Sequence, residues 1–245
     1  MAKRLGIGWD VGGWMGTKQG IAAAYFDSST DTFSWIGQPR NTNIKHHKEW
    51  SPEGIIDALD SSVSLDDFED IVVAIDASLG FPLKFQQLVN MSKSELDIPP
   101  KEIYNPFAYR ETERHIFEKF NKKPLSATFD KLGNNTTLAL SYALSWTANH
   151  DFKIIPQQGS NDESRSIIEV YPALIKESEQ GFKKEGLLDL IPADLPKKSD
   201  AYDASICALL ALLFKGNGDL IENVMLTHPP DEFPYVKEEG WIYYI

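Results

Sequence analysis

Five acidic residues stand at positions where an α/β protein can gather metal ligands. Each ends or follows a short apolar stretch, or opens an apolar helix: Asp10, Asp76, Glu169, Asp200 and Asp203. Clustered carboxylates repel one another, which raises their pKa values unless a divalent cation screens them. Oxygen ligands without thiolates or paired imidazoles suit Mg²⁺ or Mn²⁺. The five acids therefore predict a metal site, and two ions about 3.5–4 Å apart in such a site would stabilise the attacking and leaving oxygens of a phosphodiester displacement.

Within this set, Asp10, Asp76 and Asp203 are the predicted catalytic residues. Asp203 lies one turn into an otherwise apolar helix, where a charge needs a partner. Taken singly, an acid at a strand end is also typical of a turn, and Asp200 also suits the N-terminal dipole of a helix. The prediction depends on these acids meeting at one edge of a sheet.

The first acid lies in the stretch 5–16, LGIGWDVGGWMG. Its alternating apolar residues predict a buried strand that delivers Asp10 into a glycine-rich turn. Glycines let backbone approach backbone, or an anion, without an intervening Cβ. We therefore expect the N–H groups of Gly12 and Gly13 to contact a substrate phosphate.

The second acid follows a continuous β-branched run. Residues 71–75, IVVAI, are typical of a strand buried on both faces, and the strand ends on Asp76 and a small-residue turn. Ligands of open α/β sheets gather at the carboxyl ends of strands. Acids on neighbouring strands would thus lie close enough to share one cation.

The remaining elements carry turn or capping signals at their ends. They are a strand at 4–11, a hairpin of strands at 20–26 and 32–36, helices at 52–61, 107–120, 136–149, 173–179 and 200–215, and strands at 166–170 and 239–245. Ser51 and Ser199 are the expected N-caps of two of these helices. The pattern predicts an α/β fold that begins with an antiparallel meander.

Residues 83–150 are predicted to form a helical insertion or lid on the sheet rather than an independent domain. Arg110 and Arg114 are spaced i, i+4 there, so that both guanidinium groups would bind one phosphate or carboxylate. The alternative is that Glu113 or Glu118 pairs with them on the surface.

The composition of the chain limits which classes of protein and of site are possible. With 245 residues and 42% hydrophobic residues, the chain has the size of one large domain, with or without an insertion. A net charge of −12 argues against a whole surface that binds duplex nucleic acid, although lysine pairs leave room for a local basic groove: Lys122-Lys123, Lys183-Lys184 and Lys197-Lys198. The single Cys207 excludes an internal disulfide and a thiolate metal site. We expect no membrane span, no signal peptide and a cytoplasmic location.

Together, five segments resemble a family of predicted RNase H-like nucleases that is still classed as a domain of unknown function. They are GWDVGGW, AIDASLGFP, the Arg110 to Arg114 segment, IEVYPA and SDAYDASICALLAL. The last also resembles the Asp-x-x-Asp-Ala helix of RuvC-type resolvases.

This resemblance implies a ribonuclease H-like mixed sheet, with three antiparallel strands, then parallel strands, and helices on both faces. By position it maps Asp10, Asp76 and Asp203 to metal ligands, with Glu169 or Asp200 as the fourth. The chain departs from the family where Ser78 replaces a proline.

Three functions follow as hypotheses. The first is a Mg²⁺- or Mn²⁺-dependent nuclease or phosphodiesterase that acts on nucleic acid or a nucleotide. The second is nucleotide binding of the actin/sugar-kinase type, because Asp10-Val-Gly-Gly resembles the phosphate loop of those proteins. The third is a non-catalytic interaction protein on the same fold. The sequence leaves the substrate and the oligomeric state open.

Overall fold

The computed structural model describes residues 3–14, 18–92, 98–129, 132–177, 186–216 and 218–245. Its strands are β1 (Lys3–Asp10), β2 (Gln19–Asp27), β3 (Thr32–Trp35), β4 (Arg40–Thr42), β5 (Asp70–Asp76), β6 (Lys153–Ile154), β7 (Arg165–Val170) and β8 (Ile242–Tyr243). Its α-helices are α1 (Pro52–Leu59), α2 (Leu83–Val89), α3 (Glu111–Phe120), α4 (Leu132–Asn149), α5 (Pro172–Glu177), α7 (Asp200–Lys215) and α8 (Val236–Glu239).

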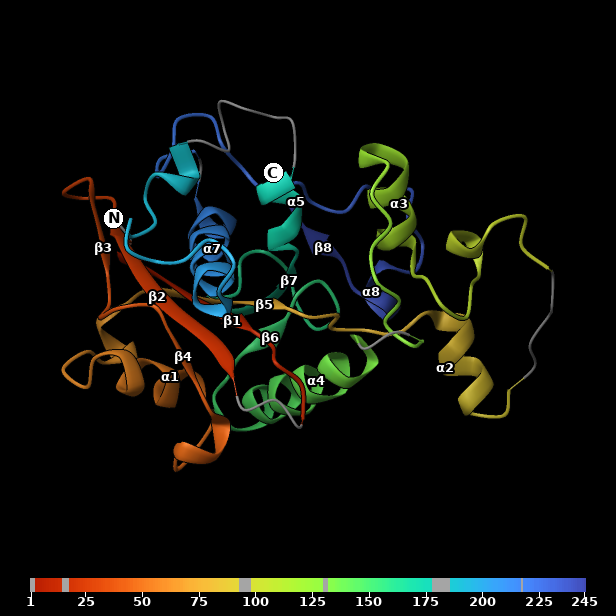
Figure 1. Ribbon diagram of the computed structural model, residues 1–245, viewed down its shortest axis with the longest axis horizontal. Helices are drawn as coiled ribbons and strands as arrows, with labels where there is room; N and C mark the ends of the chain where they lie inside the picture. Colours follow the sequence, from red (N-terminus) through yellow and green to blue (C-terminus); the bar gives the residue numbers. More distant parts are fainter. Residues whose placement is uncertain (1–2, 15–17, 93–97, 130–131, 178–185, 217) are drawn as a thin grey trace.

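All eight strands belong to one mixed sheet (Figure 1). Its order is β3-β2-β1-β5-β7-β6, with β4 paired to β2 and β8 paired to β7. The first three strands are antiparallel, whereas β1, β5, β7 and β6 run parallel. The predicted meander and the mixed α/β sheet are therefore confirmed. No sequence pattern indicated the short β4 and β6, and only Ile242–Tyr243 of the expected terminal strand pairs.

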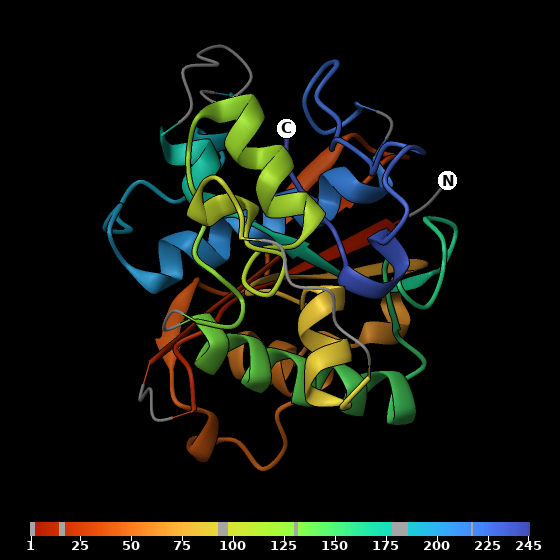
Figure 2. The same cartoon turned by 90° about the vertical axis from the view of Figure 1, so that its right-hand side faces the viewer.

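Helices cover both faces of this sheet. Figure 2 shows α4 (green) and α7 (blue) on opposite sides of the strands. Side chains of β1 alternate accordingly, because Leu5, Ile7 and Trp9 belong to the core cluster that includes α4 residues. The intervening Gly6 and Gly8 face α7, and a Cβ on Gly8 would lie 1.9 Å from the carbonyl oxygen of Ala204. The backbone of α7 thus lies directly on β1.

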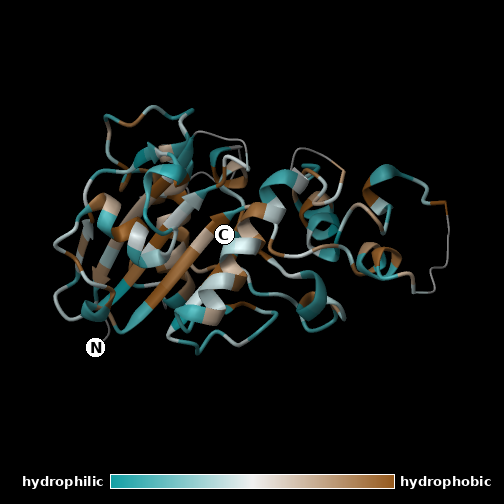
Figure 3. Cartoon of the chain, turned by 90° about the horizontal axis from the view of Figure 1, so that it is seen from below, coloured by the Kyte–Doolittle hydropathy of each residue, from teal (hydrophilic) through white to brown (hydrophobic). Residues whose placement is uncertain are grey.

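The long helix α7 forms as predicted. The side chain of Ser199 accepts a hydrogen bond from the Tyr202 N–H, and the helix ends before Gly216. From Ala201 to Phe214 every residue except Asp203 is buried. In Figure 3 the strands are largely brown, while many surrounding loops are teal. The core therefore lies between the sheet and its covering helices.

Segment 83–150 carries the helices α2, α3 and α4, and two starts differ from the prediction, since α4 begins at Leu132 rather than at 136. The expected helix at 107–120 begins only at Glu111, because Arg110 has extended backbone angles and serves as its N-cap. Helix α4 buries Leu138, Ala139 and Trp146 against the sheet, so it is a layer of the core. The pair Lys183-Lys184 and the end of the expected 173–179 helix lie outside the described residues.

None of the described helices has the length and apolar character needed to cross a lipid bilayer.

Candidate active site

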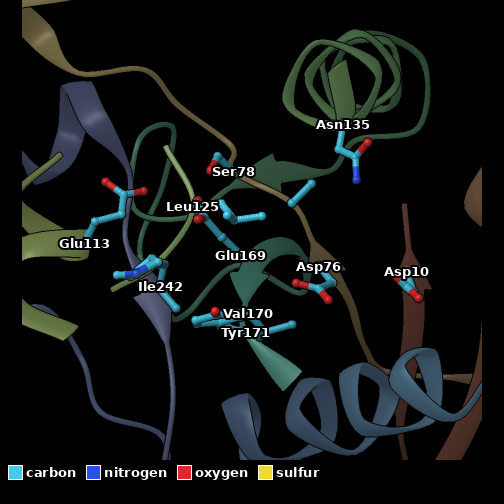
Figure 4. Close-up of a pocket in the computed structure, with 12 residues that line it drawn as sticks. Asp10, Asp76, Ser78, Glu113, Leu125, Asn135, Glu169, Val170, Tyr171 and Ile242 are labelled. Atoms are coloured by element: carbon cyan, nitrogen blue, oxygen red, sulfur yellow. The ribbon is translucent and has the colours of Figure 1, made fainter. Parts of the chain in front are cut away.

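Asp10 and Asp76 meet at the carboxyl ends of two neighbouring strands. They are register partners in the parallel pairing of β1 and β5, where strands lie about 4.8 Å apart. Both side chains are partly exposed and line a pocket of about 200 Å³ (Figure 4). The expected convergence of these two acids is confirmed.

The alternation of each strand decides which acids share a face. Asp10 lies four residues after Gly6 and two after Gly8, and both glycines face α7. Asp76 likewise follows Val72 and Ala74, which pack in the α7 cluster. Both carboxylates therefore leave the sheet on the side of the helix that carries Asp200 and Asp203.

Close backbone contact brings the start of α7 to this strand end. Gly20 of β2 is the register partner of Asp10. A Cβ on Gly20 would lie 2.0 Å from the carbonyl oxygen of Asp200. Only a glycine fits at this point, so β2 lets the first turn of α7 approach the acid pair.

The pocket lies among the ends of β1, β5 and β7. Its lining residues are Asp10, Asp76, Ala77, Ser78, Glu113, Pro124, Leu125, Asn135, Glu169, Val170, Tyr171 and Ile242. Asn135 reaches it from α4 and donates a hydrogen bond to the Val11 carbonyl oxygen at 2.6 Å. Helix α4 thereby fixes the chain just after Asp10.

The acid pair is electrostatically strained. Burial raises the pKa of Asp10 to about 9, and the charges of Asp76, Asp203 and Asp200 add to this rise. The pKa of Asp76 is raised to about 7; burial is the largest cause, and the charge of Asp203 is the second largest. In the described part of the chain no hydrogen-bond donor contacts either carboxylate. A cation in the pocket would relieve this repulsion.

Asp203 belongs to the same cluster but already has a cationic partner. Lys176 Nζ lies 2.6 Å from its Oδ1 and 2.8 Å from its Oδ2. Burial raises the pKa of Asp203, while the hydrogen bond and charge of Lys176 lower it. Lys176 also lowers the pKa values of Asp10 and Asp76. The lysine therefore offsets part of the negative charge.

Glu169 lines the same pocket and its charge adds to the rise in the pKa of Asp76, but unlike the acid pair it already has a cationic partner, which argues against its predicted role as a metal ligand. It is the register partner of Ile75, which packs on the α4 side of the sheet. Its carboxylate accepts hydrogen bonds from Arg110 and from the Leu79 N–H, the latter at 2.8 Å, and it is only 3% exposed. The strand parity that brings Asp76 toward α7 sends Glu169 to the other face.

Arg110 is a structural cation, which corrects its predicted role in binding substrate. It is fully buried, and its guanidinium donates to Glu113, Glu169, Ser78 and the carbonyl oxygen of Glu239. Burial alone would lower its pKa, but the two carboxylates raise it. The pairing with Glu113 was foreseen as a surface contact, yet it is buried.

Arg114 does not share a phosphate-binding face with Arg110. Because Arg110 precedes α3, the expected i, i+4 pair on one helix does not form. Arg114 instead donates to the Tyr109 carbonyl oxygen at 2.7 Å. The prediction that these two arginines bind one phosphate is therefore wrong.

The glycine turn packs against the protein itself. The Gly12 N–H donates to the side-chain oxygen of Gln19 at 2.9 Å, so it is not available for the predicted phosphate contact. Gly13 has a φ of +75°, and a Cβ there would lie 2.4 Å from the side chain of Asn134. Close packing on Lys18, Gln19 and α4 explains both glycines. The predicted substrate contact is wrong for the Gly12 N–H and stays a prediction for that of Gly13.

Sequence reasoning missed Lys176 and Asn135. Lys176, which directly follows the apolar residues 173–175 (ALI), was the available signal for the first. Asn135 lies among polar residues in the first turn of α4, and its sequence context gave no signal. Both lie beside the acids only because the fold brings α5 and α4 to the same end of the sheet.

No group of three or more histidine, cysteine or acidic side chains is arranged to hold a metal ion among the described residues. Asp10 and Asp76 nevertheless suit Mg²⁺, which is commonly held by one or two carboxylates and completes its shell with water and substrate phosphate. No protein-family model, curated protein or solved structure matches this chain.

Proposed function

We propose that this chain is a Mg²⁺- or Mn²⁺-dependent phosphodiesterase, with nucleic acid or a nucleotide as substrate, on a ribonuclease H-like fold. One observation carries the proposal: Asp10 and Asp76 are register partners at a pocket, with raised pKa values and no hydrogen-bond donor from the described residues. The strand order, antiparallel and then parallel, supports the fold assignment.

The roles of the acids follow from their positions. Asp10 and Asp76 would hold the cation, which when bound supplies Lewis-acid stabilisation of charge on the phosphate. Asp203 and Asp200 lie on the facing helix and would complete the negative surface around it. Glu169 and Arg110 instead hold the pocket wall, because Glu169 accepts from the Leu79 N–H just beyond the β5 strand end.

Lys122 is the residue to which we assign the attraction of substrate phosphate that was predicted for Arg110 and Arg114. Its charge reaches Asp76 and lowers the pKa of that residue. Its Nζ donates to the Ala173 carbonyl oxygen at 3.1 Å and lies 5.2 Å from the ring centre of Tyr171, a pocket residue. A lysine at this rim would attract a substrate phosphate toward the acids.

Two features weigh against the other hypotheses. The kinase-like hypothesis needs free N–H groups in the glycine turn, but the N–H of Gly12 donates to the side chain of Gln19. A non-catalytic role does not explain why two mutually repelling acids are held side by side in a pocket. Strained carboxylates of this kind are typical of functional sites.

The test is hydrolysis in the presence of Mn²⁺ or Mg²⁺. Substrates are single-stranded and duplex DNA, RNA, cyclic and linear nucleotides, and bis-p-nitrophenyl phosphate. We expect the wild type to hydrolyse at least one of them, and Asp10→Asn or Asp76→Asn to lower the rate by about 100-fold or more. Asp66→Asn is the matched control, because Asp66 is 90% exposed and lies outside the pocket.

Equal rates for the wild type and Asp10→Asn on every substrate would refute the proposal, as would the absence of hydrolysis across the panel. Calorimetry with ATP and Mg²⁺ separates the kinase-like alternative, since tight ATP binding without hydrolysis of any phosphodiester favours that reading.

A further inference from the structure

Lys176 contacts Asp203 through both carboxylate oxygens, at 2.6 and 2.8 Å. The lysine comes from α5, just after β7, and the acid from the first turn of α7. Their side chains are 26% and 22% exposed, so the pair lies at the border between protein and solvent. This ion pair connects two elements beside the pocket.

The charge of Lys176 acts on the whole cluster. Burial raises the pKa values of Asp10, Asp76 and Asp203, and Lys176 lowers all of them. A divalent cation bound by the same acids would act in the same direction. In the metal-free protein the lysine therefore supplies part of the positive charge that the acids need.

An ion that ligated Asp203 would compete with Lys176 for the same carboxylate oxygens. A Mg²⁺ ion lies about 2.0–2.1 Å from its ligand oxygens, on lone pairs that the ammonium of Lys176 now occupies on Asp203. Two cations on one carboxylate would also repel each other. As the side chains stand, the described residues form no group of three metal-binding acids, so Asp203 would join Asp10 and Asp76 around an ion only after the ammonium leaves. Its flexible four-carbon stem allows it to move into solvent.

We propose that Lys176 is a built-in competitor of the divalent cation, bound to Asp203 in the metal-free protein and displaced when the ion binds. This inference rests on the metal-dependent function proposed above and assigns that site a regulator. The lysine weakens ion affinity, and it stabilises the acids when no ion is present.

Calorimetric titration with Mn²⁺ alone, without substrate, tests the proposal in a double-mutant cycle. Lys176→Met binds Mn²⁺ about tenfold more tightly than the wild type. In an Asp203→Asn background the same lysine substitution changes the affinity by less than about threefold, because the contested carboxylate is gone. An unchanged or weaker affinity of Lys176→Met overturns the inference. An equal gain in both backgrounds also overturns it, since the lysine would then act only through distant charge.

Two variants control for charge and folding. Lys119→Met removes a positive charge outside the pocket, where the Nζ of Lys119 donates to the hydroxyl of Tyr244. It changes Mn²⁺ affinity by less than about threefold, so a gain equal to that of Lys176→Met contradicts the proposal. Lys176→Arg keeps the charge and binds no more tightly than the wild type. Thermal unfolding of each variant verifies that it is folded.

The cycle also separates this inference from the proposed function. If Asp10→Asn abolishes Mn²⁺ binding while Lys176→Met leaves it unchanged, the metal site stands and the competitor role fails. If Asp10→Asn binds Mn²⁺ as the wild type does, or if no variant binds it, the metal site itself fails.

Discussion

Asp10 is the register partner of Asp76 in the parallel pairing of β1 and β5, and both side chains leave the sheet toward α7. Strand geometry alone holds these carboxylates together, because neither accepts a hydrogen bond from the described residues. Such an arrangement costs folding free energy, and enzymes commonly retain that cost at their active sites.

Removing one of these charges is expected to stabilise the protein in alkaline solution. The folded-state pKa of Asp10 is about 9, above its unfolded value of 3.8, so the native state binds more protons between these values. Wild-type stability is thus fully present below the unfolded pKa and is lost as the pH rises through about 9. Asp10→Asn removes the penalty and gains about 1–2 kcal/mol at alkaline pH.

Urea denaturation at acidic and alkaline pH measures this effect. The gain of Asp10→Asn over the wild type shrinks toward acidic pH, whereas Asp66→Asn shows no such dependence. An Asp10→Asn protein that is less stable than the wild type in alkaline buffer would contradict the burial and repulsion described here.

Metal affinity is expected to rise with pH. A cation on Asp10 and Asp76 displaces protons from groups with pKa values of about 9 and about 7. Mn²⁺ affinity therefore increases by up to about tenfold per pH unit while one proton is displaced, and it levels off above the pKa of Asp10. Calorimetry in buffers of different ionisation enthalpy counts the released protons. Affinity that is constant across neutral and alkaline pH would argue against ligation by these acids.

The buried ion pairs of Arg110 with Glu113 and Glu169 are expected to stabilise the folded protein. Arg110→Met leaves Glu113 and Glu169 buried without their cation, which costs about 3–5 kcal/mol in the free energy of unfolding. Arg114→Met removes a single contact to the Tyr109 carbonyl oxygen and costs about 1 kcal/mol. Chemical denaturation compares the two, and an equally small loss for both would refute the structural role of Arg110.

Close contact between β1 and α7 gives a further prediction. A Cβ at Gly8 would lie 1.9 Å from the Ala204 carbonyl oxygen and 2.6 Å from the Ala208 nitrogen. Gly8→Ala is therefore expected to destabilise the protein by about 2–3 kcal/mol. Gly186→Ala is the matched control, since its nearest neighbouring atom is 3.7 Å away and a change within about 0.5 kcal/mol is expected. Thermal unfolding distinguishes them, and equal melting temperatures would contradict the packing.

Much of the fold could be predicted because its signals are local. The β-branched run before Asp76, the serine caps and the apolar α7 each specify their own element. The order of these elements then brings Asp10 and Asp76 to neighbouring strand ends. Short strands such as β4 and β6 gave no signal, because their pairing depends on neighbours far away in the sequence.

The site was harder to predict because it depends on which face of a strand each side chain occupies and on which charged groups pair with it. Whether Glu169 faces α7 or α4 depends on one residue of register, which the sequence does not specify. Arg110 offered the chemistry of a phosphate ligand, but the fold surrounds it with two carboxylates. The position of Lys176 beside Asp203 depends on how two separate helices pack.

The glycines at positions 8 and 20 have a consequence for engineering. Because main-chain atoms of the strands touch main-chain atoms of α7, no rotamer change can alter the spacing between Asp10 and the helix that carries Asp203. A different spacing between the acidic groups would therefore require a longer or shorter acidic side chain, for example Asp203→Glu, rather than repacking of the apolar interior.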